Sequence, residues 1–302
     1  MSIFNLSGDA IATVYELDGD VASSIYDING TFIDGSDPEV DYSRYSYTQK
    51  WASKGISNAQ GFDICDGKVF WVSKSGNASV DADCYVWDLS DGSQALSTPY
   101  VTAYTGHGNN LCFDFPILYA TSAYTPHVYV NSVSSDYTTF TLLRTLYLDD
   151  GSKDVDVCID ETDNTILWSI GHTANSSDTT APYNVSKWDL TQLTDNGDGT
   201  LTPTLISTIQ IPQPANSVFY QGCKFHDGIF WYANGYSGSS SYAYVYGVDP
   251  NTGETLYVIN CETTAEPEGL AWVEESGVKG GYALYVGFAG MALRRYVFTK
   301  WK

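Results

Sequence analysis

An internal repeat is the feature of this 302-residue sequence that most limits its fold. Residues 60–71 (QGFDICDGKVFW) and 221–231 (QGCKFHDGIFW) share one pattern, in which Gln-Gly, a short strand-forming run and Asp-Gly are followed by a run ending in Phe-Trp. Asp-Gly is typical of a tight hairpin turn, because Gly accepts the positive φ that such a turn needs. Each copy continues with a third strand-forming run, an Asp-centred turn (84–92 and 244–253) and a fourth apolar run. Four antiparallel strands per repeat are typical of one blade of a β-propeller.

Three weaker copies complete the repeat. They predict strands at 107–114, 117–120, 127–130 and 142–148, then at 154–159, 165–168, 185–190 and 205–211, and finally at 268–272, 283–286 and 293–298. The last copy has three strands, so we expect a strand at 45–51 to complete it, because a propeller closes its ring and leaves no open sheet edge. The sequence therefore predicts an all-β protein: a five-bladed β-propeller over residues 45–302, preceded by a short β-rich segment over residues 1–44.

Composition agrees with a strand-rich chain and limits its partners. Aromatic residues make up 15% of the sequence and charged residues 17%, which favours broad β-sheet surfaces. The formal net charge of −22 repels a phosphate backbone or an anionic lipid surface, so we expect no nucleic-acid partner. Apolar runs fall short of the ~20 residues that a membrane span needs, so we expect no membrane insertion. The first residues lack a basic region followed by an apolar one, which predicts synthesis in the cytoplasm without a signal peptide.

The cysteines and one acidic turn give two smaller predictions. The six cysteines are scattered without a Cys-x-x-Cys pair, and we expect each to be an unpaired, buried thiol. They are Cys65, Cys84, Cys112, Cys158, Cys223 and Cys261. Residues 195–200 (DNGDGT) resemble a calcium-binding loop but lack its distal bidentate Glu, so we expect a hairpin turn there.

A polar side chain stands before glycine at the same point of four repeats. In the third repeat, alignment on the cysteines puts Lys153 at the equivalent place, with Asp154 and Asp156 close by. These positions start the innermost strands, so they should surround one end of the central channel, where propellers usually bind ligands. The predicted binding ring is Gln60, His107, Asn109, Asp154, Asp156, Gln221, Glu266 and Glu268. The alternative is that these side chains only hydrogen-bond the loop backbone between blades.

The ring could also support chemistry. A histidine beside two carboxylates can act as general acid and base, or it can bind a hard cation together with Asn109. Calcium is the candidate cofactor, and His107 and Glu268 are its candidate ligands. The sequence has no Gly-x-Ser-x-Gly elbow, no His-Glu-x-x-His and no phosphate-binding loop, so it assigns no catalytic residue.

Two loops rich in Tyr, Ser, Thr and small residues, at 119–127 and 232–244, suggest a second surface. Aromatic rings with small polar neighbours suit sugar faces and protein partners. The predicted secondary aromatic surface is Tyr119, Tyr124, Tyr232, Tyr236 and Tyr242. Alternating tyrosines in a strand can instead be sheet packing.

Two motif sets resemble known families. Residues 14–19 (VYELDG) and 25–30 (IYDING) form a pair that resembles the short tandem linker found ahead of catalytic or binding domains in phage tail and prophage-encoded proteins of gut bacteria. An edge hairpin packed on the propeller is the alternative. The blade motifs QG (60–61 and 221–222), HGN (107–109) and EPEGL (266–270) resemble an uncharacterised β-propeller family of gut bacteria and their phages, sometimes fused to SGNH-type esterases. They are also similar to gluconolactonase-like and glutamine-cyclotransferase-like propellers, in which a Glu-Gly inner strand contributes to a central site.

These resemblances imply a function but not its chemistry. They point to a phage-tail-associated or prophage-encoded, virion-associated binding protein that recognises a bacterial surface glycan or protein, with other virion proteins as further partners. The alternative is an enzyme, a hydrolase or lyase acting on a glycan or a small polar substrate at the channel mouth. The tandem linker and the missing nucleophile motif favour the binding protein, whereas the polar ring favours the enzyme.

Overall fold

The fold is described from a computed structural model. It covers residues 25–26, 32–33, 42–73, 81–98, 100–122, 125–174, 178, 180–214, 219–236, 241–278 and 280–298. Within these ranges the regular secondary structure is β-strand alone, as the sequence predicts.

Three sheets have four strands each, all paired antiparallel. The first is β4 (Ala59–Cys65), β5 (Lys68–Ser73), β6 (Asp81–Asp88) and β7 (Val101–Tyr104). The second is β16 (Tyr220–His226), β17 (Ile229–Asn234), β18 (Tyr244–Val248) and β19 (Thr255–Asn260). The third is β20 (Pro267–Glu274), β21 (Tyr282–Phe288), β22 (Ala292–Phe298) and β3 (Tyr45–Trp51).

A fourth sheet has eight strands in the order β12-β13-β14-β15-β11-β10-β9-β8. Its first half is β8 (Leu111–Asp114), β9 (Ile117–Thr121), β10 (His127–Val133) and β11 (Phe140–Tyr147). Its second half is β12 (Asp156–Asp160), β13 (Asp163–His172), β14 (Tyr183–Asp195) and β15 (Thr200–Ile211). The halves join through two parallel pairs, Thr145 with Thr200 and Leu146 with Leu201.

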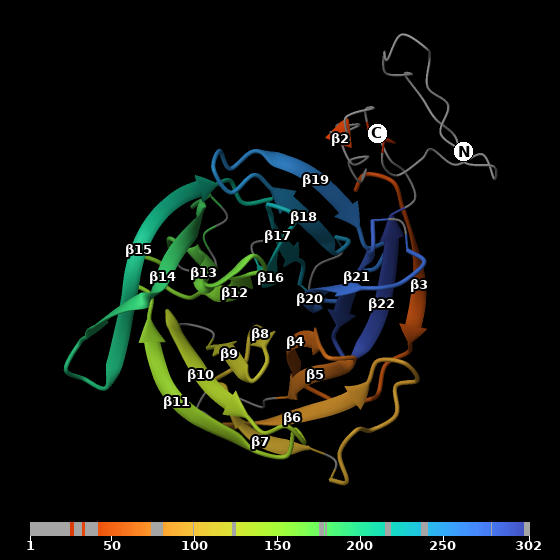
Figure 1. Ribbon diagram of the computed structural model, residues 1–302, viewed down its shortest axis with the longest axis horizontal. Helices are drawn as coiled ribbons and strands as arrows, with labels where there is room; N and C mark the ends of the chain where they lie inside the picture. The colour runs from red at the N-terminus through yellow and green to blue at the C-terminus, as the bar shows by residue number, and fades with distance from the viewer. Residues whose placement is uncertain are drawn as a thin grey trace.

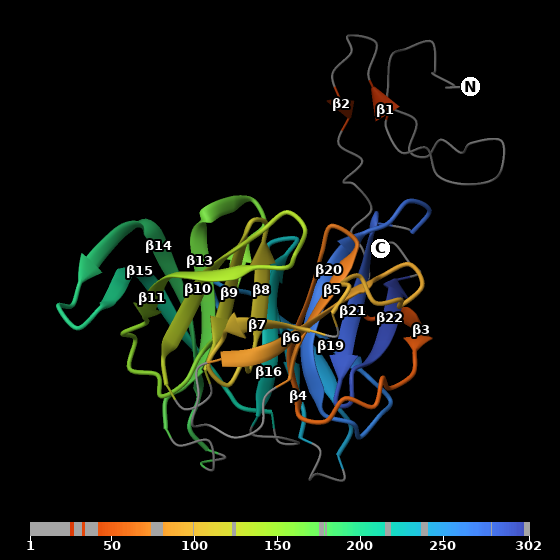
Figure 2. The same cartoon turned by 90° about the horizontal axis from the view of Figure 1, so that it is seen from below.

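The sheets are arranged around a common centre (Figure 1). Figure 2 shows the same arrangement from the side. Strands β4, β8, β12, β16 and β20 lie innermost, and β3, β7, β11, β15 and β19 lie outermost. The core fills the space between adjacent sheets, where Trp71, Trp188 and Trp231 are fully buried. The Phe-Trp pairs that end the two strongest repeats are therefore core residues.

The predicted closing strand is confirmed. Strand β3 pairs antiparallel with β22, so that Tyr47 faces Tyr296 and Tyr45 faces Phe298. An early segment of the chain thus completes the last sheet. Strands β1 (Ile25–Tyr26) and β2 (Phe32–Ile33) pair with each other, and most of the predicted N-terminal segment lies outside the described residues.

The hairpin turns predicted at the two Asp-Gly pairs and in the acidic segment 195–200 are confirmed. Asp66 and Gly67 both have positive φ, as do Asp227 and Gly228, which is the conformation that a two-residue hairpin turn requires. The acidic segment before Thr200 joins β14 to β15 as a hairpin turn.

The glycines of the Gln-Gly motifs allow inner segments of neighbouring sheets to approach closely. A Cβ on Gly61 would lie 2.5 Å from the Gly108 carbonyl oxygen, and one on Gly222 would lie 2.7 Å from the Gly269 Cα atom. The Gly61 amide donates to the Gly108 carbonyl at 2.6 Å. The motif that defines the repeat is therefore a packing requirement around the central axis.

All six cysteines are unpaired, which confirms that prediction. The expected burial is wrong for Cys65, which is only half-buried at the end of β4. Among the described residues, no helix has the length and apolar character needed to cross a membrane.

Candidate pocket at the end of the central channel

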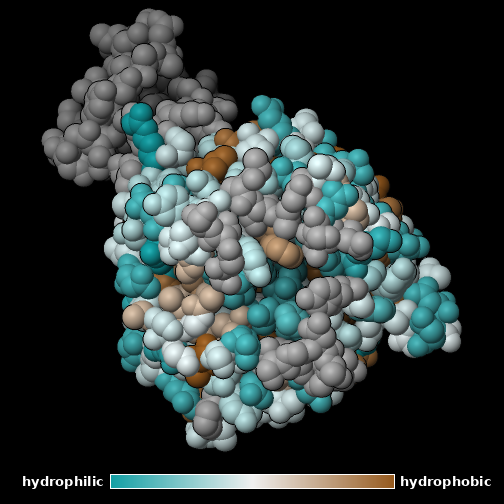
Figure 3. Space-filling view, turned by 180° about the vertical axis from the view of Figure 1, so that it is seen from behind, coloured by the Kyte–Doolittle hydropathy of each residue, from teal (hydrophilic) through white to brown (hydrophobic). Residues whose placement is uncertain are grey.

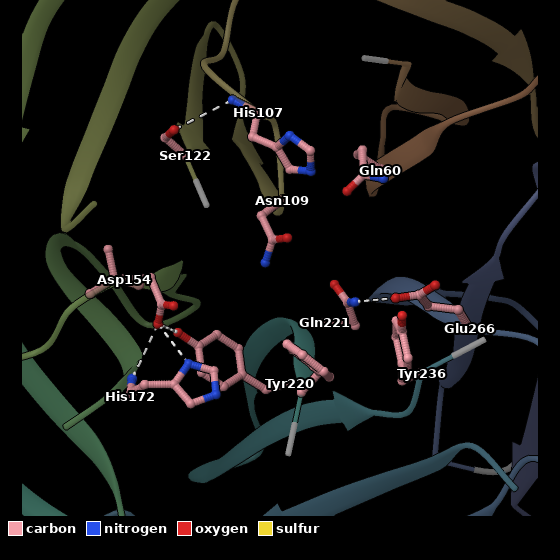
Figure 4. Close-up of a pocket in the computed structure, with 12 residues that line it drawn as sticks. Gln60, His107, Asn109, Ser122, Asp154, His172, Tyr220, Gln221, Tyr236 and Glu266 are labelled. Atoms are coloured by element: carbon pink, nitrogen blue, oxygen red, sulfur yellow. Dashed lines mark hydrogen bonds and ion pairs between the residues drawn. The ribbon is translucent and has the colours of Figure 1, made fainter. Parts of the chain in front are cut away.

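A polar pocket of about 260 Å³ lies at one end of the ring (Figure 4). Loops and inner strands of several sheets contribute to it, so it exists only in the assembled fold. Its lining residues are Gln60, His107, Asn109, Ser122, Asp154, Val155, His172, Phe219, Tyr220, Gln221, Tyr236 and Glu266. Figure 3 shows the face on which it lies, with hydrophilic side chains gathered near the middle.

Most of the predicted ring meets in this pocket. Six of its eight members, all except Asp156 and Glu268, line the cavity. Asp156 is fully buried and Glu268 is 2% exposed. The sequence thus predicted which side chains meet at one end of the fold, but not how deeply each is buried.

The predicted position of His107 is wrong. It lies in a turn before β8, where the Gly108 amide donates to the Thr105 carbonyl. Asn110, which is buried and directly precedes β8, stands at the start of that strand. The correspondence does not hold here because Gly108 belongs to the turn, whereas Gly61, Gly222 and Gly269 lie within inner strands. His107 still reaches the pocket from this turn.

Lys153 also differs from its expected place. It is exposed, and its backbone amide donates to the His172 carbonyl at 2.8 Å. Asp154 is the residue of this segment that lines the pocket. The third repeat therefore contributes a carboxylate to the cavity.

Asp154, His172 and Tyr220 form a hydrogen-bonded group in the pocket wall. The Asp154 Oδ1 atom lies 2.7 Å from His172 Nδ1 and accepts a hydrogen bond from the Tyr220 hydroxyl at 2.5 Å. The His172 ring stacks on Tyr220 with centroids 4.6 Å apart. Burial alone would raise the pKa of Asp154, but the hydrogen bonds from His172 and Tyr220 outweigh it and leave this pKa below its usual value.

Asp156 anchors the pocket from beneath. Its Oδ1 atom accepts from Asn109 Nδ2 at 3.2 Å and from the Thr121 hydroxyl at 3.1 Å, and its Oδ2 atom accepts from the Gly222 amide at 2.7 Å. Desolvation nevertheless raises the pKa of Asp156 to about 6. This carboxylate ties three neighbouring segments together and orients Asn109.

Gln221 and Glu266 form a second oriented pair. Gln221 Nε2 donates to Glu266 Oε1 at 2.7 Å. Glu268 lies close enough to Glu266 for their charges to repel each other. Burial, and to a smaller extent this repulsion, raises the pKa of Glu268 well above its usual value. Glu268 is thus suited to holding a proton rather than a charge.

Sequence reasoning missed His172, Ser122, Phe219 and Tyr220. His172 ends β13, and because β13 runs antiparallel to β12, its end lies beside the start of β12. A polar residue at the end of the second strand of a repeat was therefore an available indication of this site. Only four histidines occur in the chain, and two of them line the pocket.

A metal at His107 and Glu268 gains no support. Across the described ranges, no group of three or more His, Cys, Asp or Glu side chains is arranged to hold a metal ion. His107 lines the cavity, whereas Glu268 does not. Asp154, Asp156 and Glu266 are instead engaged with amide, hydroxyl and imidazole groups.

The predicted secondary aromatic surface divides into three parts. Tyr119 and Tyr232 are buried in the core, so their assignment to a surface is wrong. Tyr232 packs on Tyr246 with ring centroids 5.3 Å apart, which is the sheet-packing alternative. Tyr236 and Tyr242 are exposed, and Tyr236 belongs to the pocket. Tyr124 lies outside the described residues.

Comparison with known proteins informs the fold. No family model and no curated protein matches the sequence. The structure of a glutaminyl cyclase from Myxococcus xanthus is similar at a TM-score of 0.52 and 16% identity, covering 85% of this chain and 97% of that one. The fold is β-propeller-like. A nidogen/laminin complex matches at a TM-score of 0.39 and 13% identity, over 77% of this chain and 73% of that one. A luciferin-regenerating enzyme matches at a TM-score of 0.44 and 8% identity, over 85% of this chain and 97% of that one.

Proposed function

We propose that this chain is a phage-tail-associated or prophage-encoded binding protein that recognises a bacterial surface glycan in the channel-end pocket. The observation that carries the proposal is the pocket lining, which combines oriented amides and carboxylates with the rings of Phe219, Tyr220 and Tyr236. Amide and carboxylate groups hydrogen-bond sugar hydroxyls, and aromatic rings pack on the apolar faces of a sugar. The virion association rests on the resemblance of residues 14–30 to a tandem linker, and other virion proteins would be its partners.

The proposal includes a five-bladed architecture. The eight-stranded sheet counts as two blades, β8 to β11 and β12 to β15, whose outer strands touch through the short parallel pairing of β11 with β15. With the three four-stranded sheets this gives five blades. Each would contribute its inner strand, or the loop before it, to one end of the channel.

Pocket size supports a sugar unit over a bacterial surface protein as the bound group. A volume of about 260 Å³ falls slightly below the range of roughly 300–1,000 Å³ that is common for small-molecule pockets. It suits one sugar residue of a longer chain, while the rest of the glycan would extend over the face that Figure 3 shows.

A glycan array tests the proposal. The wild-type chain, Gln221→Met and Tyr242→Ala would be screened against bacterial surface glycans. Tyr242 is exposed and is not among the lining residues, so Tyr242→Ala is the control. We expect the wild type and Tyr242→Ala to share their ligands and Gln221→Met to lose them. Equal binding by the wild type and Gln221→Met, or loss only in Tyr242→Ala, would contradict the proposal.

The second candidate function is an enzyme acting on the bound ligand. The observation that favours it is the Asp154–His172–Tyr220 group. If Nδ1 of His172 donates to Asp154, the ring nitrogen with the acceptor lone pair is Nε2, which is the basic atom of the imidazole. Incubating the array ligands with wild type and His172→Gln and analysing products by mass spectrometry separates the two functions. Product formed only by the wild type would replace the binding function with an enzymatic one.

A further inference from the structure

Two carboxylates fix the orientation of two amides in the pocket. The Asn109 side chain donates through Nδ2 to Asp156, and the Gln221 side chain donates through Nε2 to Glu266. An ionised carboxylate only accepts hydrogen bonds, so the NH₂ group of each amide must face it. Each carbonyl oxygen is then directed elsewhere. Figure 4 shows both carbonyl oxygens toward the middle of the pocket.

The carbonyl oxygen of Gln221 is buried in this arrangement without a donor from the described residues. The residue is 6% exposed, and its Oε1 atom has no hydrogen-bond partner among the described residues. Burying an acceptor without a donor is unfavourable, because the group loses its hydrogen bond to water and gains none in the protein. The flipped amide cannot relieve this cost, because it would turn a carbonyl oxygen toward Glu266. A donor from a ligand would satisfy Gln221.

The charge around these oxygens is negative. Asp154 and Glu266 line the pocket, and Lys and Arg are absent from its twelve lining residues. An ammonium group has three donors, no acceptor and one positive charge. It therefore complements this set of acceptors better than a hydroxyl, which brings an acceptor of its own.

The neighbouring wall favours a sugar as the carrier of that ammonium group. The Phe219 and Tyr236 rings lie 5.1 Å apart, and Tyr220 stacks on His172 on the same side of the pocket. Together these rings give an apolar wall beside the acceptors, where a sugar ring can pack. Gln60 and Ser122 provide further polar groups for ring hydroxyls.

We propose that the pocket recognises an amino sugar with an unacetylated nitrogen, whose ammonium group donates to the Asn109 and Gln221 carbonyl oxygens beside Glu266. The proposal rests on the glycan-binding function above and names its ligand class. Acetylation of the sugar would remove the positive charge and two of the three donors. The acetyl group would also bring a carbonyl oxygen, which is an acceptor, and additional volume to a place where the pocket presents acceptors and needs donors.

Calorimetric titration at neutral pH tests this proposal with four probes. They are a glucosamine trisaccharide, the N-acetylated trisaccharide, a neutral glucose trisaccharide and a short lysine-containing peptide with blocked ends. We expect the wild type to bind the glucosamine trisaccharide at least tenfold more tightly than the other three. Gln221→Met, which keeps the side-chain length but removes the acceptor, should weaken that binding about tenfold. Leu143→Ala, at an exposed position of β11 outside the lining residues, should leave it unchanged.

Glu266→Gln tests the carboxylate that orients the amide and places negative charge beside the ammonium group. Without the carboxylate, Gln221 is no longer forced to present its carbonyl oxygen, so we expect the preference for the free amine over the acetylated sugar to fall at least fivefold. Circular dichroism and thermal unfolding would establish that each variant is folded. Equal or tighter binding of the N-acetylated or neutral trisaccharide by the wild type would overturn this proposal and leave glycan binding standing. Binding of the lysine peptide alone would overturn both.

Discussion

Lys224 Nζ lies 2.6 Å from Asp63 Oδ2, and this ion pair joins the inner strands β16 and β4 of two different sheets. Both groups are largely withdrawn from solvent, and the same Asp63 oxygen accepts from the Phe113 amide of β8 at 2.6 Å. Burial would lower the pKa of Lys224, but Asp63 outweighs it and holds that pKa above its usual value. One carboxylate thus connects three inner strands.

Removing one partner of this pair should destabilise the fold strongly. We expect Lys224→Met to lower the free energy of unfolding by about 3–5 kcal/mol, because the buried Asp63 carboxyl group would lose the cation that compensates its charge. The double variant Asp63→Asn, Lys224→Met should be more stable than the sum of the single variants predicts, by about 2 kcal/mol. Urea unfolding of the four proteins measures this coupling. Additive effects would show that the pair contributes no net coupling.

Asp156 should make stability depend on pH. Its pKa is about 6 in the folded protein against a usual value of 3.8, so the folded state keeps this proton to higher pH than the unfolded chain. The contribution of Asp156 to stability therefore falls as pH rises from about 4 to about 6. Relative to Asp156→Asn, the wild type should lose up to about 3 kcal/mol between pH 4 and pH 7. Chemical unfolding of both proteins across this range measures the difference, and parallel pH profiles would contradict the assignment.

Tyr42 should anchor the chain just before β3. Its ring packs edge-on against Trp231 and Phe298, with centroids 5.0 Å away in each case, and its hydroxyl donates to Asp227 at 3.0 Å. We expect Tyr42→Ala to cost about 3 kcal/mol through lost packing and Tyr42→Phe about 1 kcal/mol through the lost hydrogen bond. Thermal unfolding compares the two variants. An equal loss in both would mean that the hydroxyl, not the ring, is what matters.

The thiols should be unreactive in the folded protein. Burial raises the pKa of Cys84 and of Cys112 to about 12, so almost no thiolate is present at neutral pH. We expect a thiol reagent at pH 8 to modify the folded chain slowly, with half-buried Cys65 first. All six thiols should react at once in denaturant. Rapid labelling of several cysteines in the folded chain would contradict the predicted burial.

Features that depend on interactions between residues close in sequence could be predicted, whereas several that depend on distant residues could not. The turns at Asp66–Gly67 and Asp227–Gly228 depend on local backbone conformation, so the residues themselves specify them. The closing strand at Tyr45–Trp51 followed from counting strands and from the cost of an open edge. By contrast, β8 begins at Leu111 and His107 lies in the turn before it, because Gly108 belongs to that turn and not to the inner strand. Tyr220 was missed because it belongs to β16 and meets Asp154 only after two sheets have been brought together, whereas His172 lies beside the start of β12 in its own sheet.

The pairing of β3 with β22 also has a consequence during protein synthesis. Gln49 Nε2 donates to the Leu293 carbonyl across 244 positions of sequence, so β3 leaves the ribosome long before its partner strand exists. Until then it is an unpaired edge in a growing chain, open to association with other copies. Ser46, Thr48, Gln49 and Lys50 place polar groups along this strand. Such side chains discourage premature pairing between nascent chains. The composition of β3 therefore suits both the unpaired strand during synthesis and its final pairing with β22.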